Sequence, residues 1–248
     1  MAKHPSDTGA GAPREFRTTH WSLVARAGAG EATVNVRALE TLCRAYWYPL
    51  YAYVRRRGHG AEDARDLTQG FFAALLGKHA LARADRERGK FRTFLLGSLN
   101  NYLANEWDKA RALKRGGGAT LASLDERDAE DRYLHEPANQ LSPEKLFDRR
   151  WAETVLEMVF TRLRHEFEAA GQLERYELCK PGLLGDTGDF SYAAVAAKLG
   201  VGEPAVRSVV SRMRRRFREL LHTEIAGTVS ESSEVEGELH ELFAALAG

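Results

Sequence analysis

The spacing of hydrophobic residues predicts helices along almost the whole chain. Apolar positions recur every three or four residues, which is the period of an amphipathic α-helix. No segment shows the two-residue alternation of a half-buried strand. We therefore predict an all-α protein with two helical domains joined by an acidic linker, followed by a short C-terminal helix.

Residues 16–115 form the first predicted domain. Its first helical pattern, residues 36–58, contains Pro49, which should kink or interrupt the helix, and ends at a glycine. The second, residues 61–76, has an apolar face and an opposite polar face. A third helix is expected at about 91–112. The apolar positions of the second and third helices are Leu67, Phe71, Ala74, Leu75, Phe91, Leu95, Leu99, Tyr102 and Leu103.

The segment 116–142 has the composition of a linker. It begins with glycines, and residues 120–144 contain seven acidic and two basic residues. Such a sequence buries little apolar surface, so we expect it to be extended or partly disordered in isolation. After it, Ser142 and Pro143 predict the start of a long helix that ends at Gly171.

The second predicted domain, residues 143–227, ends in two closely spaced helices. An alanine-rich helix within "SYAAVAAKLG" is followed by a turn and by the helix "PAVRSVVSRMRRRFRELL". A short helix, a turn with glycine and a second helix with a basic outer face predict a helix-turn-helix. The inward positions of the second helix are Val206, Val209, Met213, Phe217 and Leu220.

Residues 228–248 read as an acidic C-terminal extension. Ser233 and Glu236 fit a capping box before an apolar stripe, which predicts a short amphipathic helix. We expect the helix at 233–247 to pack near the basic 207–218 face and to compete with DNA there.

The net charge of +1 conceals strongly charged segments. Residues 83–115 contain nine basic and four acidic residues, and residues 200–222 contain six and two. Residues 223–248 contain six acidic residues and no lysine or arginine. The average charge is therefore a poor guide, and both basic segments are candidate nucleic-acid surfaces.

The two basic segments suggest different modes of binding. On the second helix of the helix-turn-helix, arginine forks and small hydroxyl residues suit guanine edges and phosphates, at Arg207, Ser208, Ser211, Arg212 and Arg215. In the first domain, positive charge lies beside amide and aromatic groups, as single-stranded bases require. This second group consists of Lys90, Arg92, Asn100, Asn101, Asn105, Trp107, Lys109 and Arg111.

Other function classes find little support in the sequence. The chain has no P-loop, no GxSxG motif and no cluster of metal-ligating residues, so we expect neither catalysis nor a cofactor or metal. Its two cysteines are far apart and match no zinc or disulfide pattern. No apolar run reaches the roughly 20 residues of a membrane span, and the N-terminus lacks a secretory signal. Cytoplasmic residence without membrane insertion is the expectation.

Taken together, these parts resemble a bacterial RNA polymerase sigma factor. "EDARDLTQGFFAALL" looks like region 2, and "SYAAVAAKLGVGEPAVRSVVSRMRRRFRELL" looks like region 4, of the sigma-70 family. "THWSLVARAG", "GKFRTFLLGSLNNYL" and "KRGGG" resemble a subgroup of the extracytoplasmic-function type that carries a C-terminal extension. The resemblance covers about residues 16–228.

The resemblance implies partners for each surface. The clamp of the polymerase's largest subunit would meet the acidic helix at Asp63, Asp66, Gln69 and Phe72, and the polymerase flap is a second expected contact. The loop at 84–90 and the asparagine-rich helix would bind the melted minus-ten strand. The recognition helix would read the duplex minus-thirty-five element. An anti-sigma factor is a further candidate partner.

Two other functions remain open on the sequence. A stand-alone helix-turn-helix regulator would bind duplex DNA without polymerase, but it would leave the acidic helix unexplained. A helical adaptor that binds only proteins would leave both basic surfaces unexplained. Whether DNA recognition requires core polymerase distinguishes a sigma factor from a stand-alone regulator.

Overall fold

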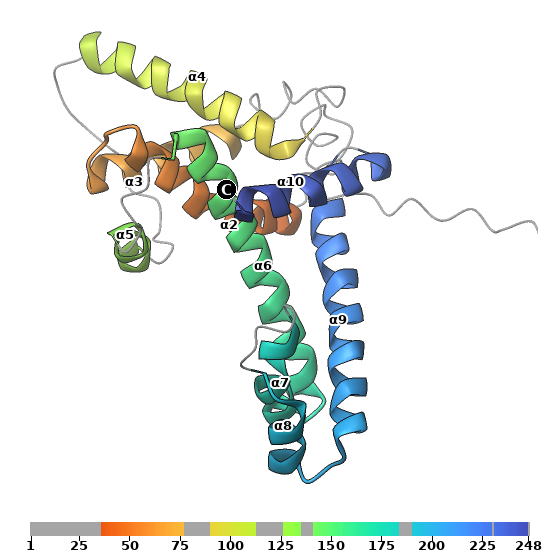
Figure 1. Cartoon of the computed structure of the whole chain (residues 1–248). Coiled ribbons are helices and arrows are strands. Elements are labelled where there is room, and N and C mark those ends of the chain that lie inside the picture. The colour runs from red at the N-terminus through yellow and green to blue at the C-terminus, as the bar shows by residue number, and fades with distance from the viewer. Residues whose placement is uncertain are drawn as a thin grey trace, which may run out of the picture.

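All regular elements in the described part of the chain are helices. The computed structural model describes residues 36–76, 90–112, 126–134, 141–183, 190–229 and 231–247, and these ranges contain no strand (Figure 1). The all-α prediction is therefore confirmed for these residues. Among them, no helix has the length and apolar character needed to cross a membrane.

Helix α2 (Val36–Arg56) lies at the centre of the first half of the molecule. All residues from 45 to 54 are buried, so this part of the helix is enclosed on every side. Of the two predicted effects of Pro49, a kink or an interruption, the interruption does not occur: the helix continues through this residue. A proline removes only one backbone donor from the helix, and the burial of the surrounding aromatic side chains offsets that loss. Those side chains include Tyr46, Trp47, Tyr48, Tyr51 and Tyr53.

Helices α3 (Ala61–Leu76) and α4 (Phe91–Ala112) complete this half. The buried face of α3 consists of Ala64, Thr68, Phe71, Phe72 and Leu75. The buried face differs from the predicted one: Ala74 was expected on it, but this residue is exposed. The ring of Phe71 meets Tyr102 of α4 edge to face, with 5.9 Å between centroids. The predicted inward face of α4 is largely confirmed, with Phe91, Leu95, Leu99 and Leu103 buried.

A close approach at Gly70 gives a first prediction. A Cβ atom at this position would lie well inside van der Waals distance of the Tyr102 hydroxyl and 3.4 Å from Cζ. We expect Gly70→Ala to lower the free energy of unfolding by about 1–2 kcal/mol, since overpacking outweighs the better helix propensity of alanine. Tyr102→Phe removes the clashing oxygen. In urea denaturation, the double variant should therefore recover most of the loss, and strictly additive effects would contradict this explanation.

Part of the predicted linker is helical. Helix α5 (Glu126–Leu134) packs against α2, where the Glu130 carboxylate accepts hydrogen bonds from Arg55 (Nη2–Oε1, 2.8 Å) and from the Tyr51 hydroxyl. The Arg55 guanidinium also lies 4.7 Å from the centroid of the Tyr133 ring. In the folded chain, residues 126–134 of the predicted linker are thus helical, because docking onto α2 stabilises a helix too short and polar to persist alone.

Helix α6 (Pro143–Ala169) connects the two halves of the molecule. Its start agrees with the prediction: the Ser142 side chain accepts a hydrogen bond from the Lys145 amide at 3.3 Å. Gly171, with φ +67°, follows its end. The first turns of α6 pack on α2, and the later turns run beside α9 (Figure 1). Phe147 and Trp151 are fully buried in the first of these contacts.

The second half contains the predicted helix-turn-helix. Helix α7 (Leu173–Cys179) and the 3-10 helix η3 (Lys180–Leu183) precede α8 (Tyr192–Leu199) and α9 (Glu203–Ala226). Ser191 caps α8, accepting from the Ala194 amide at 3.2 Å, and Gly200 ends it in the left-handed conformation with φ +64°. That conformation suits glycine and allows the sharp turn into α9.

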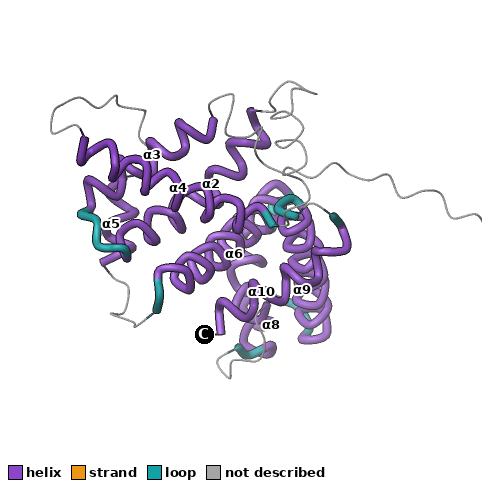
Figure 2. The backbone as a smooth tube through the Cα atoms, turned by 90° about the horizontal axis from the view of Figure 1, so that it is seen from above, coloured by secondary structure: helices purple, strands orange, loops and turns teal. Residues whose placement is uncertain are grey.

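The C-terminal extension folds back onto the core. The 3-10 helix η4 (Ser232–Glu234) leads into α10 (Val235–Ala247), which lies across α6 and α9 (Figures 1 and 2). The capping box is formed by Glu231 and Glu234, two residues before the predicted pair. Buried apolar residues make one continuous cluster from Ala45 in α2 to Leu242 in α10. The chain's two halves are thus in contact through α6 and α10.

Candidate nucleic-acid and protein interfaces

The first candidate surface is the polar face of α3. Asp63 and Asp66 are exposed and Gln69 is half-buried, so these three residues are placed much as the helical pattern predicts. Phe72 is not accessible in the same way: it is 8% exposed and lies next to Phe71, with 5.6 Å between ring centroids. The buried face of α3 includes two adjacent positions, 71 and 72. For this reason Phe72 contributes to the core and not to the surface that Asp66 presents.

The second candidate surface is the outer face of α9. The predicted reading residues Arg207, Ser208, Ser211, Arg212 and Arg215 are all exposed. Arg207 is oriented by its neighbours, because its guanidinium lies 4.2 Å from the centroid of the Tyr192 ring in α8 and its Nη2 is 2.5 Å from Glu203. Five exposed side chains on one helix face can contact both phosphates and base edges.

Two other arginines of α9 have structural partners. Arg214 donates to the backbone carbonyl of Gly182 from Nε at 3.0 Å and from Nη2 at 2.6 Å. Arg216 donates to both carboxylate oxygens of Glu166 in α6, at 2.8 and 2.7 Å. These hydrogen bonds hold the pKa of Glu166 below its usual value. Arg214 and Arg216 therefore fix α9 against η3 and α6.

One basic residue near α9 was not predicted as part of a binding surface. Arg175 of α7 lies with Arg212 on the walls of two cavities of about 320 and 200 Å³. The larger cavity is also lined by Arg215 and Arg216. Periodicity could not reveal this grouping, since α7 is short and only the packing of α7 against α9 brings the guanidinium groups together. The positive surface thus extends from the recognition helix onto α7.

The third candidate surface is the exposed side of α4. Asn101 and Asn105 are exposed, and Trp107 is 61% exposed. Asn100 is more constrained, because its Oδ1 accepts hydrogen bonds from the Tyr53 hydroxyl at 2.9 Å and from Arg57 Nη1 at 2.6 Å. The side chains of Lys109 and Arg111 lie outside the described residues, as does the predicted loop at 84–90 except for Lys90.

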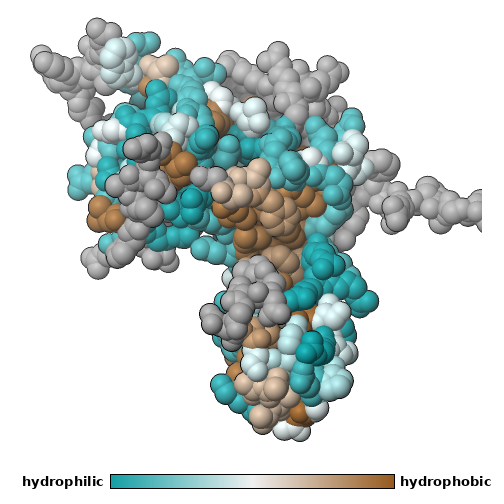
Figure 3. Space-filling model, in the orientation of Figure 1, coloured by the Kyte–Doolittle hydropathy of each residue, from teal (hydrophilic) through white to brown (hydrophobic). Residues whose placement is uncertain are grey.

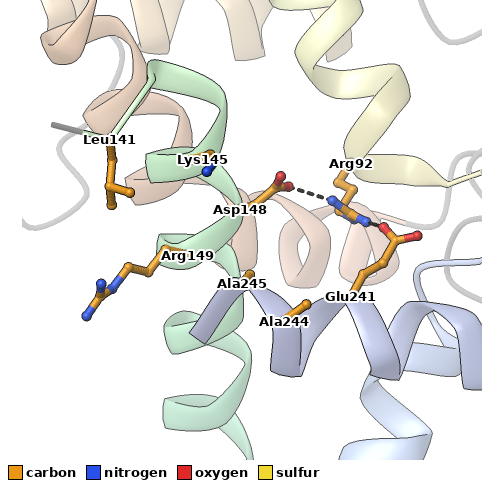
Figure 4. A pocket seen from close by; sticks show the side chains of 8 residues that line it. All are labelled: Arg92, Leu141, Lys145, Asp148, Arg149, Glu241, Ala244 and Ala245. Carbon is orange, nitrogen blue, oxygen red and sulfur yellow. Dashed lines mark hydrogen bonds and ion pairs between the residues drawn. The ribbon is translucent and has the colours of Figure 1, made fainter. Parts of the chain in front are cut away.

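Lys90 and Arg92 do not belong to that exposed surface. Arg92 is 8% exposed; its Nε donates to Glu238 at 2.7 Å, and its Nη1 donates to Asp148 at 2.5 Å. It also forms an ion pair with Glu241 (Figure 4). The Arg92 guanidinium lies 4.8 Å from the centroid of the Trp151 ring. In this structure, Arg92 therefore connects α4 with α6 and α10, which its predicted role in DNA binding did not anticipate.

The electrostatics of this contact follow from burial. Burial alone would lower the pKa of Arg92, but its hydrogen bonds with Glu238 and Asp148 outweigh that effect and raise it. Burial raises the pKa of Asp148, and the charge of Arg92 acts in the opposite direction.

Lys90 lies 2.9 Å from Glu238, which is completely buried, and also pairs with Glu241. We name Lys90, Arg92, Asp148, Glu238 and Glu241 the tail clamp.

The tail clamp corrects the expected position of the C-terminal helix. We expected α10 to lie near the basic 207–218 face, but its carboxylates instead meet the basic residues at the start of α4. The backbone supports the same arrangement, because the Phe91 amide donates to the Thr228 carbonyl at 3.1 Å. Complementary charges exist on both basic segments, and only the path of the chain after α9 decides which one α10 meets.

The described residues contain no group of three or more histidine, cysteine, aspartate or glutamate side chains that could hold a metal ion. Comparison of the chain with protein-family models, with curated proteins and with solved structures found no match. The resemblance to sigma factors therefore depends on the sequence motifs alone, and the chain's family stays a prediction.

Proposed function

We propose that this protein is a sigma-type promoter-specificity subunit of bacterial RNA polymerase. In this proposal it binds core polymerase, recognises a two-part promoter and stabilises the opened DNA, without covalent chemistry of its own. The observation that carries the proposal is the helix-turn-helix of α8 and α9, with five predicted reading residues exposed on one face of α9. The two-domain division, the flap contact and the cytoplasmic location are parts of the same proposal.

The face of α9 is suited to duplex DNA. The second helix of a helix-turn-helix enters the major groove, where arginine pairs with guanine and small hydroxyl residues allow close approach. Tyr192 and Glu203 hold Arg207 on this face, so part of the side-chain ordering precedes binding. Arg175 of α7 would add a phosphate contact beside the recognition helix. In this proposal, α9 reads the minus-thirty-five element.

The exposed side of α4 is suited to single-stranded DNA. An exposed tryptophan offers a stacking face, and asparagine side chains can hydrogen-bond to the edges of unpaired bases. Asn101 and Asn105 supply the amides on one face of α4, and Trp107 supplies the ring from a different face of the same helix. Such a surface is not needed by a protein that binds only duplex DNA, which favours the sigma reading over a stand-alone regulator.

The acidic face of α3 would bind the polymerase. Exposed Asp66 can pair with basic groups of the clamp, and half-buried Gln69 can add directional hydrogen bonds at the edge of the contact. The measurement is transcription in vitro with core polymerase and a library of promoter fragments. In this assay, we expect Asp66→Ala combined with Gln69→Ala to reduce promoter-dependent transcription about tenfold or more. Raising the concentration of the variant should restore part of the signal, because the defect lies in affinity.

The matched control is Glu236→Ala, which removes an exposed acidic side chain of α10. This variant should transcribe as the wild-type chain does. If no promoter fragment yields a transcript with the wild-type chain, and the chain alone still binds a particular duplex sequence, then a stand-alone helix-turn-helix regulator becomes the better explanation.

A further inference from the structure

The C-terminal helix holds two basic side chains that lie at the very start of α4. Glu238 and Glu241 of α10 are both within ion-pair distance of Lys90, and both also pair with Arg92. Lys90 and Arg92 begin the helix that carries Asn101, Asn105 and Trp107. In the folded chain, carboxylates thus occupy the positive end of a helix whose exposed side is a candidate surface for nucleic acid.

This site has the chemistry of an anion-binding site. An amino group and a guanidinium lie together at a helix N-terminus, where the helix dipole also favours negative charge. Arginine binds carboxylate and phosphate with the same fork of donors. The two carboxylates of α10 therefore take positions that two phosphate groups of a nucleic-acid backbone could take, and both ligands cannot be present together.

A phosphate could reach this site while α10 is still in place. Arg92, Asp148 and Glu241 line a cavity of about 250 Å³, and Lys145 and Arg149 of α6 lie on its wall (Figure 4). Arg92 and Lys145 are thus basic residues of this cavity, whereas the Arg149 guanidinium points away from Arg92 and donates to Glu153 (Figure 4). An incoming anion would be attracted to this cavity and would compete first with Glu241, which is 48% exposed, and afterwards with buried Glu238.

Few residues of α10 are fully buried, and Leu239, Ala245 and Leu246 pack against the core only partly buried. Only Val235, Glu238 and Leu242 of its 13 residues are buried. Phe243 is 54% exposed. The molecular surface is apolar where α10 crosses α6 (Figure 3). A helix of this length is marginal by itself in water, so its docking depends on a few contacts. The tail clamp supplies the polar part of them.

We propose that α10 is a built-in competitor: it occupies an anion site formed by Lys90 and Arg92, and the backbone of single-stranded DNA displaces it. The inference rests on the proposed function. The extension thereby lowers the affinity of the free protein for DNA until a single strand displaces α10.

The first test measures binding of a fluorescein-labelled single-stranded oligonucleotide to the full chain by anisotropy. Glu241→Gln removes one exposed partner of Lys90 and Arg92, and Glu236→Gln makes the same charge change on α10 at an exposed position outside the tail clamp. We expect Glu241→Gln to bind about three- to fivefold more tightly than wild type, because the fraction of open protein increases. Glu236→Gln should match wild type.

A third variant checks that the gain uses the same site. Adding Lys90→Ala to Glu241→Gln should remove the increase in affinity and reduce the dependence of binding on salt. If Glu241→Gln changed only the thermal stability, and its oligonucleotide affinity equalled that of Glu236→Gln, the tail clamp would be a purely structural contact and the inference would be wrong.

Hydrogen exchange of the wild-type chain provides a test without substitution. On addition of the oligonucleotide, the amides of residues 235–247 should exchange faster, while those of α4 become protected. Unchanged or slower exchange in α10 during saturating binding would overturn the inference. The two proposals fail separately: polymerase-dependent transcription with unchanged exchange in α10 removes only this inference. Absence of promoter-dependent transcription removes the proposed function.

Discussion

Replacing Trp151 with alanine should lower the free energy of unfolding by about 3–5 kcal/mol. This side chain is completely buried where α6 packs on α2, and the guanidinium of Arg92 lies over its ring at 4.8 Å. Truncation would leave a large cavity in the contact between the two halves and would also remove the cation–π interaction. Urea denaturation followed by far-UV circular dichroism measures the loss.

Trp107→Ala is the matched control for this prediction. Trp107 is 61% exposed on α4, so the same truncation should change the stability by less than about 1 kcal/mol. Similar losses in both variants would mean that α6 does not depend on Trp151 for its packing against α2. The Trp107 variant also separates function from stability, because it should still weaken binding of single-stranded DNA.

Removing Arg92 should be nearly as damaging. Arg92→Ala leaves Glu238, which has no exposed surface, with only Lys90 as a cationic partner, and the loss of one member of a buried ion pair costs about 3–5 kcal/mol. Arg162→Ala, which breaks an exposed ion pair, is the control for Arg92→Ala. Arg162 is 49% exposed at its pair with Glu224, and its loss should cost less than about 1 kcal/mol.

A compensating substitution tests the reason for the loss. Combining Arg92→Met with Glu238→Leu removes both buried charges, and this double variant should be more stable than Arg92→Ala. Thermal unfolding of the wild-type chain, Arg92→Ala, Arg162→Ala and the double variant measures the differences in stability. If the double variant were the least stable of them, packing around Arg92 would dominate over the cost of an unpaired carboxylate.

Local sequence signals predicted several elements with accurate boundaries. The helix at 61–76 agrees with α3, and the serine, proline and glycine around α6 mark its two ends. The turn at Gly200 separates α8 from α9 as expected. These features depend on a few neighbouring residues: hydrogen bonds of capping side chains, the fixed φ of proline and the left-handed conformation of glycine.

Predictions that depended on packing partners were less accurate. Pro49 does not interrupt α2, and part of the acidic linker forms α5, since both segments gain from burial or ion pairing against other elements. Phe72 is buried because other elements contact a wider part of the surface of α3 than the apolar pattern predicted. The cluster of predicted single-strand residues is divided, with Lys90 and Arg92 held by α10 and Asn101, Asn105 and Trp107 exposed.

The sequence by itself determined the helical class, the helix-turn-helix and the outward face of α9, because helix periodicity and capping act over a few residues. Only the tertiary structure decided which of two basic segments the acidic α10 meets. Charge complementarity is long-ranged and unspecific, and both segments satisfied it. The short connection after α9, the Phe91–Thr228 backbone hydrogen bond and the burial of Val235 and Leu242 select the start of α4.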